Sequence, residues 1–196
     1  MKKIILASAS PRRKEIMEML GVDFDVVVSN IDETMDESLS IEERIMEIAR
    51  KKALDVLNSN PECLVIGSDT IVEVDGRILG KPHNEAEAEG MIHLISNRSH
   101  RVVTALAVVS KDEEYVDCDV AHVHFIDIPE KEIKEYVLTD EPYDKAGRYA
   151  IQGWAGVYIS RIEGSFYTVM GLPLHLVYQR LFELGYKRKK AKSIDG

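Results

Sequence analysis

Two spacings of apolar residues recur along this chain, and they predict interleaved strands and helices. Short apolar runs between polar or turn residues predict strands at residues 4–7, 24–28, 63–67, 71–74, 77–79, 101–110, 115–127 and 156–162. Helical spacing and capping signals predict helices at residues 11–20, 41–57, 85–95, 130–138 and 173–184. This mixture of hairpins and crossovers predicts an α/β domain whose central mixed, twisted sheet is flanked by helices.

Local signals define several of these boundaries. Ser10 precedes Pro11 in the order expected of an N-cap and a first helical residue, and Gly21 follows as a stop. Ser40 and Glu43 have the spacing of a capping box at the start of the second helix. Asp75-Gly76 lies between two short apolar runs and predicts a hairpin turn.

Length and charge narrow the class of protein. The chain has 196 residues and no repeat or linker, so we expect one domain over residues 1–186 and a solvated basic tail over residues 187–196. A net charge of −9 argues against binding to a nucleic acid polymer.

Targeting signals and metal patterns are not recognisable in the sequence. No stretch reaches the roughly 18 apolar residues of a membrane helix, and the run from Ile4 to Ala7 is too short for a signal peptide. Cys63 and Cys118 have no metal-ligand spacing. A cytoplasmic location without a membrane partner is therefore the expectation.

The turn between the first predicted strand and the first predicted helix carries positive charge where a helix disfavours it. Arg12 and Arg13 open a helix whose N-terminus already carries partial positive charge. With Ser8, Ser10 and free backbone amides, they would form a phosphate-binding site. The alternative is that both guanidinium groups point into solvent.

Lys52 is an exception to the pattern that charged residues lie opposite the apolar stripe of a helix, because it falls within that stripe. An inward lysine lines a cleft or pairs with an acid. Alternatively, its stem passes along the edge of the core and its ammonium group reaches water.

Asp69 follows the apolar run Leu64–Gly67. An acid at the end of a buried strand could hold Mg²⁺ or take a proton from water, or could simply cap a turn. Glu33 follows the second strand and is a candidate partner, and Lys81 lies on a glycine-permitted loop.

A glycine-bounded segment from Asp144 to Gly153 adds hydrogen-bonding groups. Lys145 could bind phosphate, and the Gln152 amide could contact a base edge. Trp154 could stack on a base, although packing is the preferred interpretation. No P-loop, dinucleotide loop or zinc pattern is present, so the residues alone indicate phosphate-ester or phosphoanhydride chemistry without naming a substrate.

Taken in order, these motifs resemble the Maf family of nucleotide pyrophosphatases, also called septum-formation-protein homologues. The matching segments are residues 8–13, 32–33, Lys52, 67–70, 79–82, 144–147, 149–153 and 169–173. The resemblance implies an elongated two-lobed α/β domain with a cleft, similar to the inosine-triphosphate pyrophosphatase fold. It implies hydrolysis of nucleoside triphosphates to the monophosphate and diphosphate with a divalent cation, Mg²⁺ or Mn²⁺.

The resemblance also assigns roles residue by residue. Asp69 corresponds to the proton acceptor, with Lys52 and Lys81 as catalytic cations and Glu33 beside Asp69 as the metal-binding acid. The expected substrate-binding residues are Ser8, Arg12, Arg13, Thr70, Lys145 and Gln152. Arg12, Thr70 and Gln152 match the subfamily that prefers dTTP and UTP, and family members often form homodimers. Arg148 departs from the family pattern beside the base-reading loop.

Four other functions remain open at this point. The chain could act on modified purine nucleotides such as 7-methyl-GTP, or clear modified pyrimidine nucleotides. It could be a non-enzymatic nucleotide-binding regulator of cell division, although such a protein needs no water-activating acid. It could bind nucleic acid through its tail, which the net charge disfavours.

Overall fold

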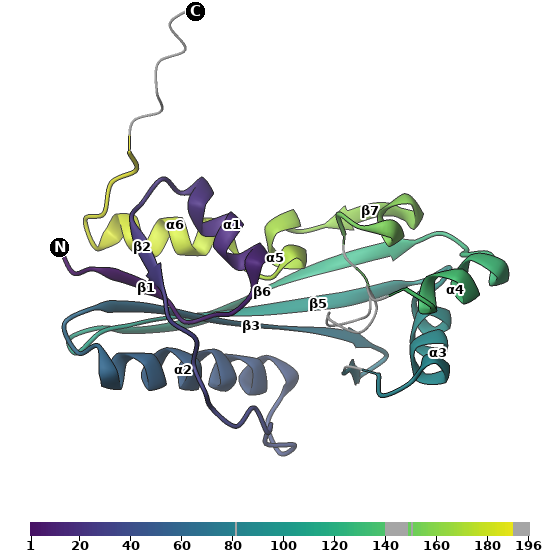
Figure 1. Cartoon of the computed structure of the whole chain (residues 1–196), viewed down its shortest axis with the longest axis horizontal. Coiled ribbons are helices and arrows are strands. Elements are labelled where there is room, and N and C mark those ends of the chain that lie inside the picture. The colour runs from purple at the N-terminus through teal and green to yellow at the C-terminus, as the bar shows by residue number, and fades with distance from the viewer. Residues whose placement is uncertain (81, 140–148, 150, 190–196) are drawn as a thin grey trace, which may run out of the picture. The chain divides into compact units, whose positions relative to one another are not determined.

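The computed structural model describes residues 1–80, 82–139, 149 and 151–189. Its strands form one sheet in the order β2-β1-β3-β5-β6-β7, with β4 paired to β3 off this path (Figure 1). The strands are β1 (Ile4–Leu6), β2 (Phe24–Val26), β3 (Leu64–Val74), β4 (Arg77–Leu79), β5 (Ser99–Val109), β6 (Glu114–Phe125) and β7 (Ile159–Glu163). β1 is parallel to β2 and β3, whereas β4 and β7 are antiparallel to their neighbours, which confirms the mixed α/β class.

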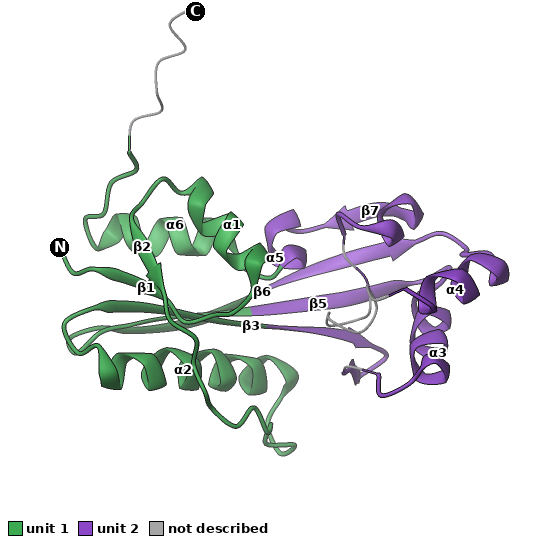
Figure 2. Ribbon diagram, in the orientation of Figure 1, with its two compact units in different colours: residues 1–69, 105–118, 171–196 green, residues 70–104, 119–170 purple. Residues whose placement is uncertain are grey.

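The chain divides into two compact units (Figure 2). Unit 1 contains residues 1–69, 105–118 and 171–196, and unit 2 contains residues 70–104 and 119–170. β3, β5 and β6 contribute residues to both units.

Unit 1 has helices on both faces of its strands. α1 (Pro11–Met19) and α6 (Leu174–Glu183) cover one face, and α2 (Ile41–Ser59) covers the other (Figure 1). The apolar stripe of α2 is buried as predicted, and Lys52 is buried with it. The capping box of Ser40 and Glu43 is also confirmed.

Unit 2 has its own apolar core. It contains α3 (Glu85–Ile95), α4 (Glu130–Val137), the 3-10 helix η3 (Trp154–Tyr158) and α5 (Phe166–Met170), and α3 packs against α4. The core is built from buried side chains of α3, α4, η3, β3, β5 and β6, including Val72, Ile92, Val102, Phe125 and Tyr136.

Three predictions about secondary structure are wrong. The two strands expected at residues 63–67 and 71–74 are one continuous strand, β3. Residues 68–70 continue the strand because each of these polar side chains has a hydrogen-bonding partner on a neighbouring element. Residues 154–158 form a 3-10 helix where a strand was expected to begin at residue 156, and α5 was not predicted.

The start of the basic tail contacts α1. Arg188 donates hydrogen bonds to the carbonyl oxygens of Met19 and Leu20, and the Lys189 amide donates to Gly21. Positive charge at a helix C-terminus complements the helix dipole. Residues 190–196 lie outside the described residues, and the domain boundary at residue 186 stays a prediction.

Candidate active site

The turn between β1 and α1 has the capped geometry expected from its sequence. Ser10 is the N-cap of α1 and accepts a hydrogen bond of 3.4 Å from the Arg13 amide, with Pro11 at the first helical position. Ser8 Oγ accepts the Ser10 amide at 3.1 Å and the Arg13 guanidinium at 3.4 Å. Because Ser8 acts as an acceptor in both contacts, its hydroxyl proton is available to an anion.

The Arg13 guanidinium is turned inward rather than into solvent. Its Nε donates a hydrogen bond of 2.7 Å to the carbonyl oxygen of Gly171, and its Nη2 lies 3.9 Å from Asp69 Oδ1. The Gly171 carbonyl also accepts Ser68 Oγ at 3.2 Å. Gly171 has φ of +111°, a conformation that favours glycine, so the residue type at this position helps to orient Arg13.

Lys52 of α2 pairs with two acids. Its Nζ lies 2.8 Å from Asp69 Oδ1 and 2.9 Å from Glu33 Oε1. The Lys52 and Asp69 side chains are only 10% and 14% exposed, whereas Glu33 is 58% exposed. The inward lysine therefore pairs with an acid, and its ammonium group does not extend past the core edge to water.

Close packing of α2 on β3 makes the contact between Lys52 and Asp69 possible. A Cβ atom added at Gly67 would lie 2.9 Å from Ala53 Cβ and would also collide with the Ala49 carbonyl oxygen. Any larger residue at position 67 would push the helix away from the strand. Gly67 thus holds the helix that bears Lys52 against the strand that bears Asp69.

Burial shapes the electrostatics of this group. Desolvation lowers the pKa of the Arg13 guanidinium, and the charge of Asp69 partly offsets that effect. An arginine starts from so high a pKa that it stays cationic at neutral pH. Arg12 is half-buried and makes no hydrogen bond or ion pair within the described part of the chain. Two cations, Arg13 and Lys52, therefore lie beside the largely buried Asp69 carboxylate, and Lys52 also pairs with the exposed Glu33.

The ten residues predicted for the site fall into three groups. Unit 1 holds Ser8, Arg12, Arg13, Glu33, Lys52 and Asp69. Unit 2 holds Thr70 and Gln152. Lys81 and Lys145 lie outside the described residues, so their placement stays a prediction.

In unit 2, Thr70 takes part in a group of buried hydroxyls that sequence reasoning missed. Thr70 Oγ1 lies 3.0 Å from Thr104 Oγ1, and Thr104 Oγ1 donates at 2.7 Å to the Thr168 carbonyl oxygen. Thr104 and Thr168 are fully buried. The available signal was a single hydroxyl residue, Thr104, inside the otherwise apolar run of β5.

The other predicted base-reading residue of unit 2, Gln152, is exposed just before η3. The neighbouring Trp154 stacks on Tyr136, with ring centroids 4.3 Å apart, so the packing interpretation of this tryptophan is confirmed. Upstream, the Tyr149 hydroxyl lies 2.6 Å from His100 Nε2, and both residues are buried. Burial lowers the pKa of His100 to about 4 and raises the pKa of Tyr149, so both are neutral at pH 7.

A separate group in unit 2 could hold a metal ion. The ligand atoms of Glu89, His93 and Glu130 lie within 4.8 Å of one another on α3 and α4. Glu130 already pairs with Lys134 at 3.1 Å and lies in the first turn of α4, where its negative charge suits the helix dipole. A surface ion-pair group accounts for these contacts without a metal.

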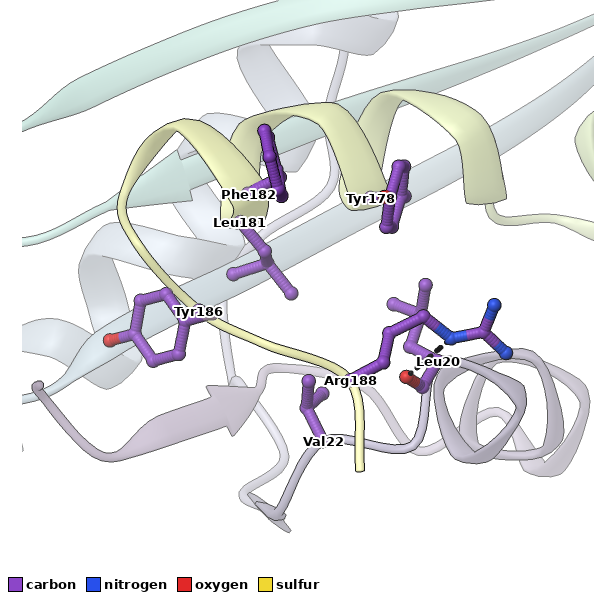
Figure 3. Close-up of a pocket in the computed structure, with 7 residues that line it drawn as sticks. All are labelled: Leu20, Val22, Tyr178, Leu181, Phe182, Tyr186 and Arg188. Atoms are coloured by element: carbon purple, nitrogen blue, oxygen red, sulfur yellow. Dashed lines mark hydrogen bonds between the residues drawn. The ribbon is translucent and has the colours of Figure 1, made fainter. Parts of the chain in front are cut away.

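Unit 1 also has an apolar hollow that contains none of the predicted site residues. It is lined by residues of the segment after α1, of α6 and of the segment after α6, namely Leu20, Val22, Tyr178, Leu181, Phe182, Tyr186 and Arg188. Figure 3 shows Arg188 beside Leu20, joined by the hydrogen bond to the Leu20 carbonyl oxygen. This lining supplies no general base and no group of cations for a phosphate.

Within the residues that the structure describes, none of the helices combines the length and apolar character needed to cross a bilayer.

Known proteins resemble this chain over nearly its whole length. Residues 3–184 match the family model described as Maf-like protein. A protein of Caldicellulosiruptor bescii named dTTP/UTP pyrophosphatase is 44% identical over 198 residues, which cover 98% of this chain and 100% of that protein. A Bacillus cereus protein of the same name is 44% identical over 181 residues, which cover 92% of this chain and 89% of that protein.

Among solved structures, the Ham1 protein of Staphylococcus aureus matches 63% of this chain and 72% of its own chain. The sequence identity is 20% and the TM-score is 0.45, a value too low to establish a shared fold.

Proposed function

The chain belongs to the Maf-like protein family, and we propose that it is a nucleoside triphosphate pyrophosphatase that hydrolyses dTTP and UTP to the monophosphate and diphosphate. The observation that carries this proposal is the largely buried contact of Lys52 and Arg13 with Asp69. Relatives that align with more than nine-tenths of the chain are named for this reaction, which supports the choice of substrate.

Unit 1 supplies the groups that bind the triphosphate. A nucleoside triphosphate carries about four negative charges, and cleavage places more charge on the diphosphate that leaves. Arg12, Arg13 and Lys52 would neutralise this charge, and Ser8 would donate its hydroxyl proton to a phosphate oxygen. Lys81 and Lys145 belong to the proposal as further phosphate ligands on the strength of the sequence alone.

Asp69 is the group that would act on water. Its carboxylate is held by Lys52, and Arg13 lies nearby, so its position is fixed before substrate arrives. The oxygen of a water molecule attacks the α-phosphorus and forms a new bond to it. The phosphoanhydride bond between the α- and β-phosphates breaks, and the diphosphate leaves with the bonding electrons. Asp69 takes the proton of this water or binds the metal that activates it.

The acids of the site fit a divalent cation. Glu33 and Asp69 offer carboxylate oxygens, which are the ligands that Mg²⁺ and Mn²⁺ prefer, and substrate phosphates commonly complete such sites. Both carboxylates already share one positively charged partner, Lys52, so positive charge is favoured beside them. Such a cation would polarise the phosphate oxygens and acidify the attacking water.

Unit 2 supplies neutral groups that suit a base. Thr70 and the exposed Gln152 offer hydrogen bonds without charge, and these can complement the N3–H and O4 edge that uracil and thymine share. The proposal therefore divides the work between charged groups for the phosphates and neutral groups for the base.

Diphosphate release from a panel of triphosphates tests the proposal. The purified chain is incubated with dTTP, UTP, CTP, GTP, ITP and 7-methyl-GTP in the presence of Mg²⁺ or Mn²⁺. Fast turnover of dTTP and UTP that is abolished by EDTA is the expected result. Turnover of purine nucleotides alone would overturn the assigned substrate but keep the reaction. Nucleotide binding without turnover would favour a regulator.

Two further features belong to the proposal. A cytoplasmic location agrees with a reaction on nucleoside triphosphates, and fractionation of cells that express the chain would test it. A homodimer is the expected assembly, and light scattering of the purified chain would measure it.

A further inference from the structure

Lys52 of α2 lies between two acids that differ in their exposure to water. Its Nζ lies 2.8 Å from Asp69 Oδ1 and 2.9 Å from Glu33 Oε1. The Asp69 side chain is largely buried, so separating it from Lys52 would leave a charge unpaired away from water, which is costly. The Glu33 side chain is exposed, and water screens its charge. The contact with Glu33 is therefore the one that Lys52 loses more readily.

Glu33 can change its partner without a change in the backbone. It lies in the segment between β2 and α2, outside any helix or strand. The Asp32 carboxylate accepts hydrogen bonds from the Thr34 amide at 3.0 Å and from the Thr34 hydroxyl at 2.7 Å, which closes a turn around Glu33. Because the Glu33 side chain is exposed, rotation about its own bonds is enough to carry the carboxylate away from Lys52.

The proposed function gives both partners of this contact another ligand. Glu33 is one of the two carboxylates that fit Mg²⁺ or Mn²⁺, and Lys52 is one of the cations that would bind the triphosphate. While the two side chains pair with each other, Glu33 rather than a phosphate neutralises the Lys52 ammonium group. The negative charge of Glu33 at this position also repels an incoming phosphate. Without a divalent cation, the contact therefore opposes phosphate binding.

We propose that Glu33 is the counter-ion of Lys52 in the absence of metal, and that it releases Lys52 to the phosphates when it turns to a divalent cation. This inference rests on the proposed function. The contact of Lys52 with Asp69 stays in place, so Lys52 and Glu33 each exchange one partner. Metal binding and phosphate binding then favour each other, because each removes the partner that the other must displace.

The first test measures binding without metal and without turnover. The parent and Glu33→Gln are titrated with inorganic diphosphate in EDTA by calorimetry. Glutamine keeps the size of the side chain but removes its negative charge, so we expect Glu33→Gln to bind diphosphate about fivefold more tightly than the parent. Glu37→Gln, which removes an exposed acid of the same segment, should stay within about twofold of the parent. No gain in folded Glu33→Gln, or an equal gain in Glu37→Gln, would overturn the inference.

The second test measures binding of Mn²⁺ alone by electron paramagnetic resonance. Lys52→Met removes the ammonium group that competes for Glu33, so this variant should bind Mn²⁺ about fivefold more tightly than the parent. Lys51→Met, which removes the neighbouring lysine of α2, should stay within about twofold of the parent. Weaker Mn²⁺ binding by folded Lys52→Met would mean that the lysine only orders the carboxylates, and would overturn the inference. If a thermal melt shows that Lys52→Met does not fold, the result for Glu33→Gln decides.

The outcomes also separate this inference from the proposed function. If the parent chain releases diphosphate from UTP but Glu33→Gln binds diphosphate no more tightly than the parent, only this inference fails. If the parent turns over no pyrimidine triphosphate, the proposed function and this inference fail together.

Discussion

Unit 1 and unit 2 hold their polar groups in different ways. In unit 1 two cations, Arg13 and Lys52, lie beside the largely buried Asp69 carboxylate. In unit 2 two pairs are neutral, Thr70 with Thr104 and His100 with Tyr149, and one buried acid, Glu73, forms a charged pair with Arg101. Both arrangements pair polar side chains with one another, but they suit different ligands.

The difference follows from what each kind of group can recognise. Buried charges attract a phosphate strongly but distinguish poorly between ligands of different shape, because the attraction between charges falls off slowly with distance. Neutral hydrogen bonds are weaker and depend on which atom donates. Under the proposed function, binding a triphosphate calls for charged groups and choosing among bases calls for neutral ones.

The largest expected effect comes from substituting Asp69, which lies in the charged group of unit 1. Asp69→Asn should lower kcat for UTP about a thousandfold, because an amide neither takes the proton nor binds the metal well. The fold should survive, since the carbonyl oxygen of the substituted side-chain amide can still accept a hydrogen bond from Lys52. Diphosphate release and a thermal melt measure the two effects.

A matched control for this substitution is Asp36→Asn, which changes an exposed acid of the same unit. The control should keep parental kcat. Near-parental turnover by folded Asp69→Asn would remove Asp69 from the chemistry and with it the assignment of unit 1 as the reacting side.

The neutral state of the buried His100 in unit 2 can be tested by measuring how the stability of the fold depends on pH. Burial, with smaller contributions from His124 and His122, lowers the pKa of His100 to about 4, whereas an unfolded histidine titrates near 6.5. Between these values the unfolded chain binds a proton that the folded chain does not, so stability is lost as pH falls through this window. The expected loss between pH 7 and pH 5 is about 2 kcal/mol.

His100→Gln keeps a group that can bond to the Tyr149 hydroxyl but does not titrate. Urea unfolding at several pH values should show a smaller loss between pH 7 and pH 5 for this variant than for the parent. His83→Gln, at an exposed position of the same unit, should retain the parental dependence. Identical pH curves for His100→Gln and the parent would contradict a buried neutral histidine in unit 2.

The smallest expected effect concerns the exposed glutamine of unit 2. Gln152→Ala should lower the ratio of kcat/KM for UTP to that for GTP about tenfold, with kcat for UTP changed by less than about threefold. Gln179→Ala, on an exposed position of α6 in unit 1, provides the comparison. A loss of turnover on all substrates alike would mean that Gln152 serves the phosphates and that the two units do not divide the work as proposed.

Much of the fold was predictable because its signals are local. Ser10, Pro11 and Ser40 mark helix starts through hydrogen bonds to residues at most three positions away, and the structure confirms them. β3 was wrongly divided because the partners that satisfy residues 68–70 come from distant segments, such as Ala105 for Ser68. Short-range patterns hold no information about such partners.

By itself, the sequence determined the α/β class, the capped turn at Ser8–Arg13 and the position of Lys52 within the apolar stripe of its helix, since each depends on residue spacing within one element. Only the tertiary structure decided that Lys52 pairs with Asp69 and Glu33, that Arg13 bonds to Gly171, and that the Thr104 hydroxyl contacts the Thr70 hydroxyl. Those contacts join residues separated by between 17 and 158 positions. They form because the packing of helices and strands brings the side chains together, and that packing depends on the whole core rather than on any local pattern.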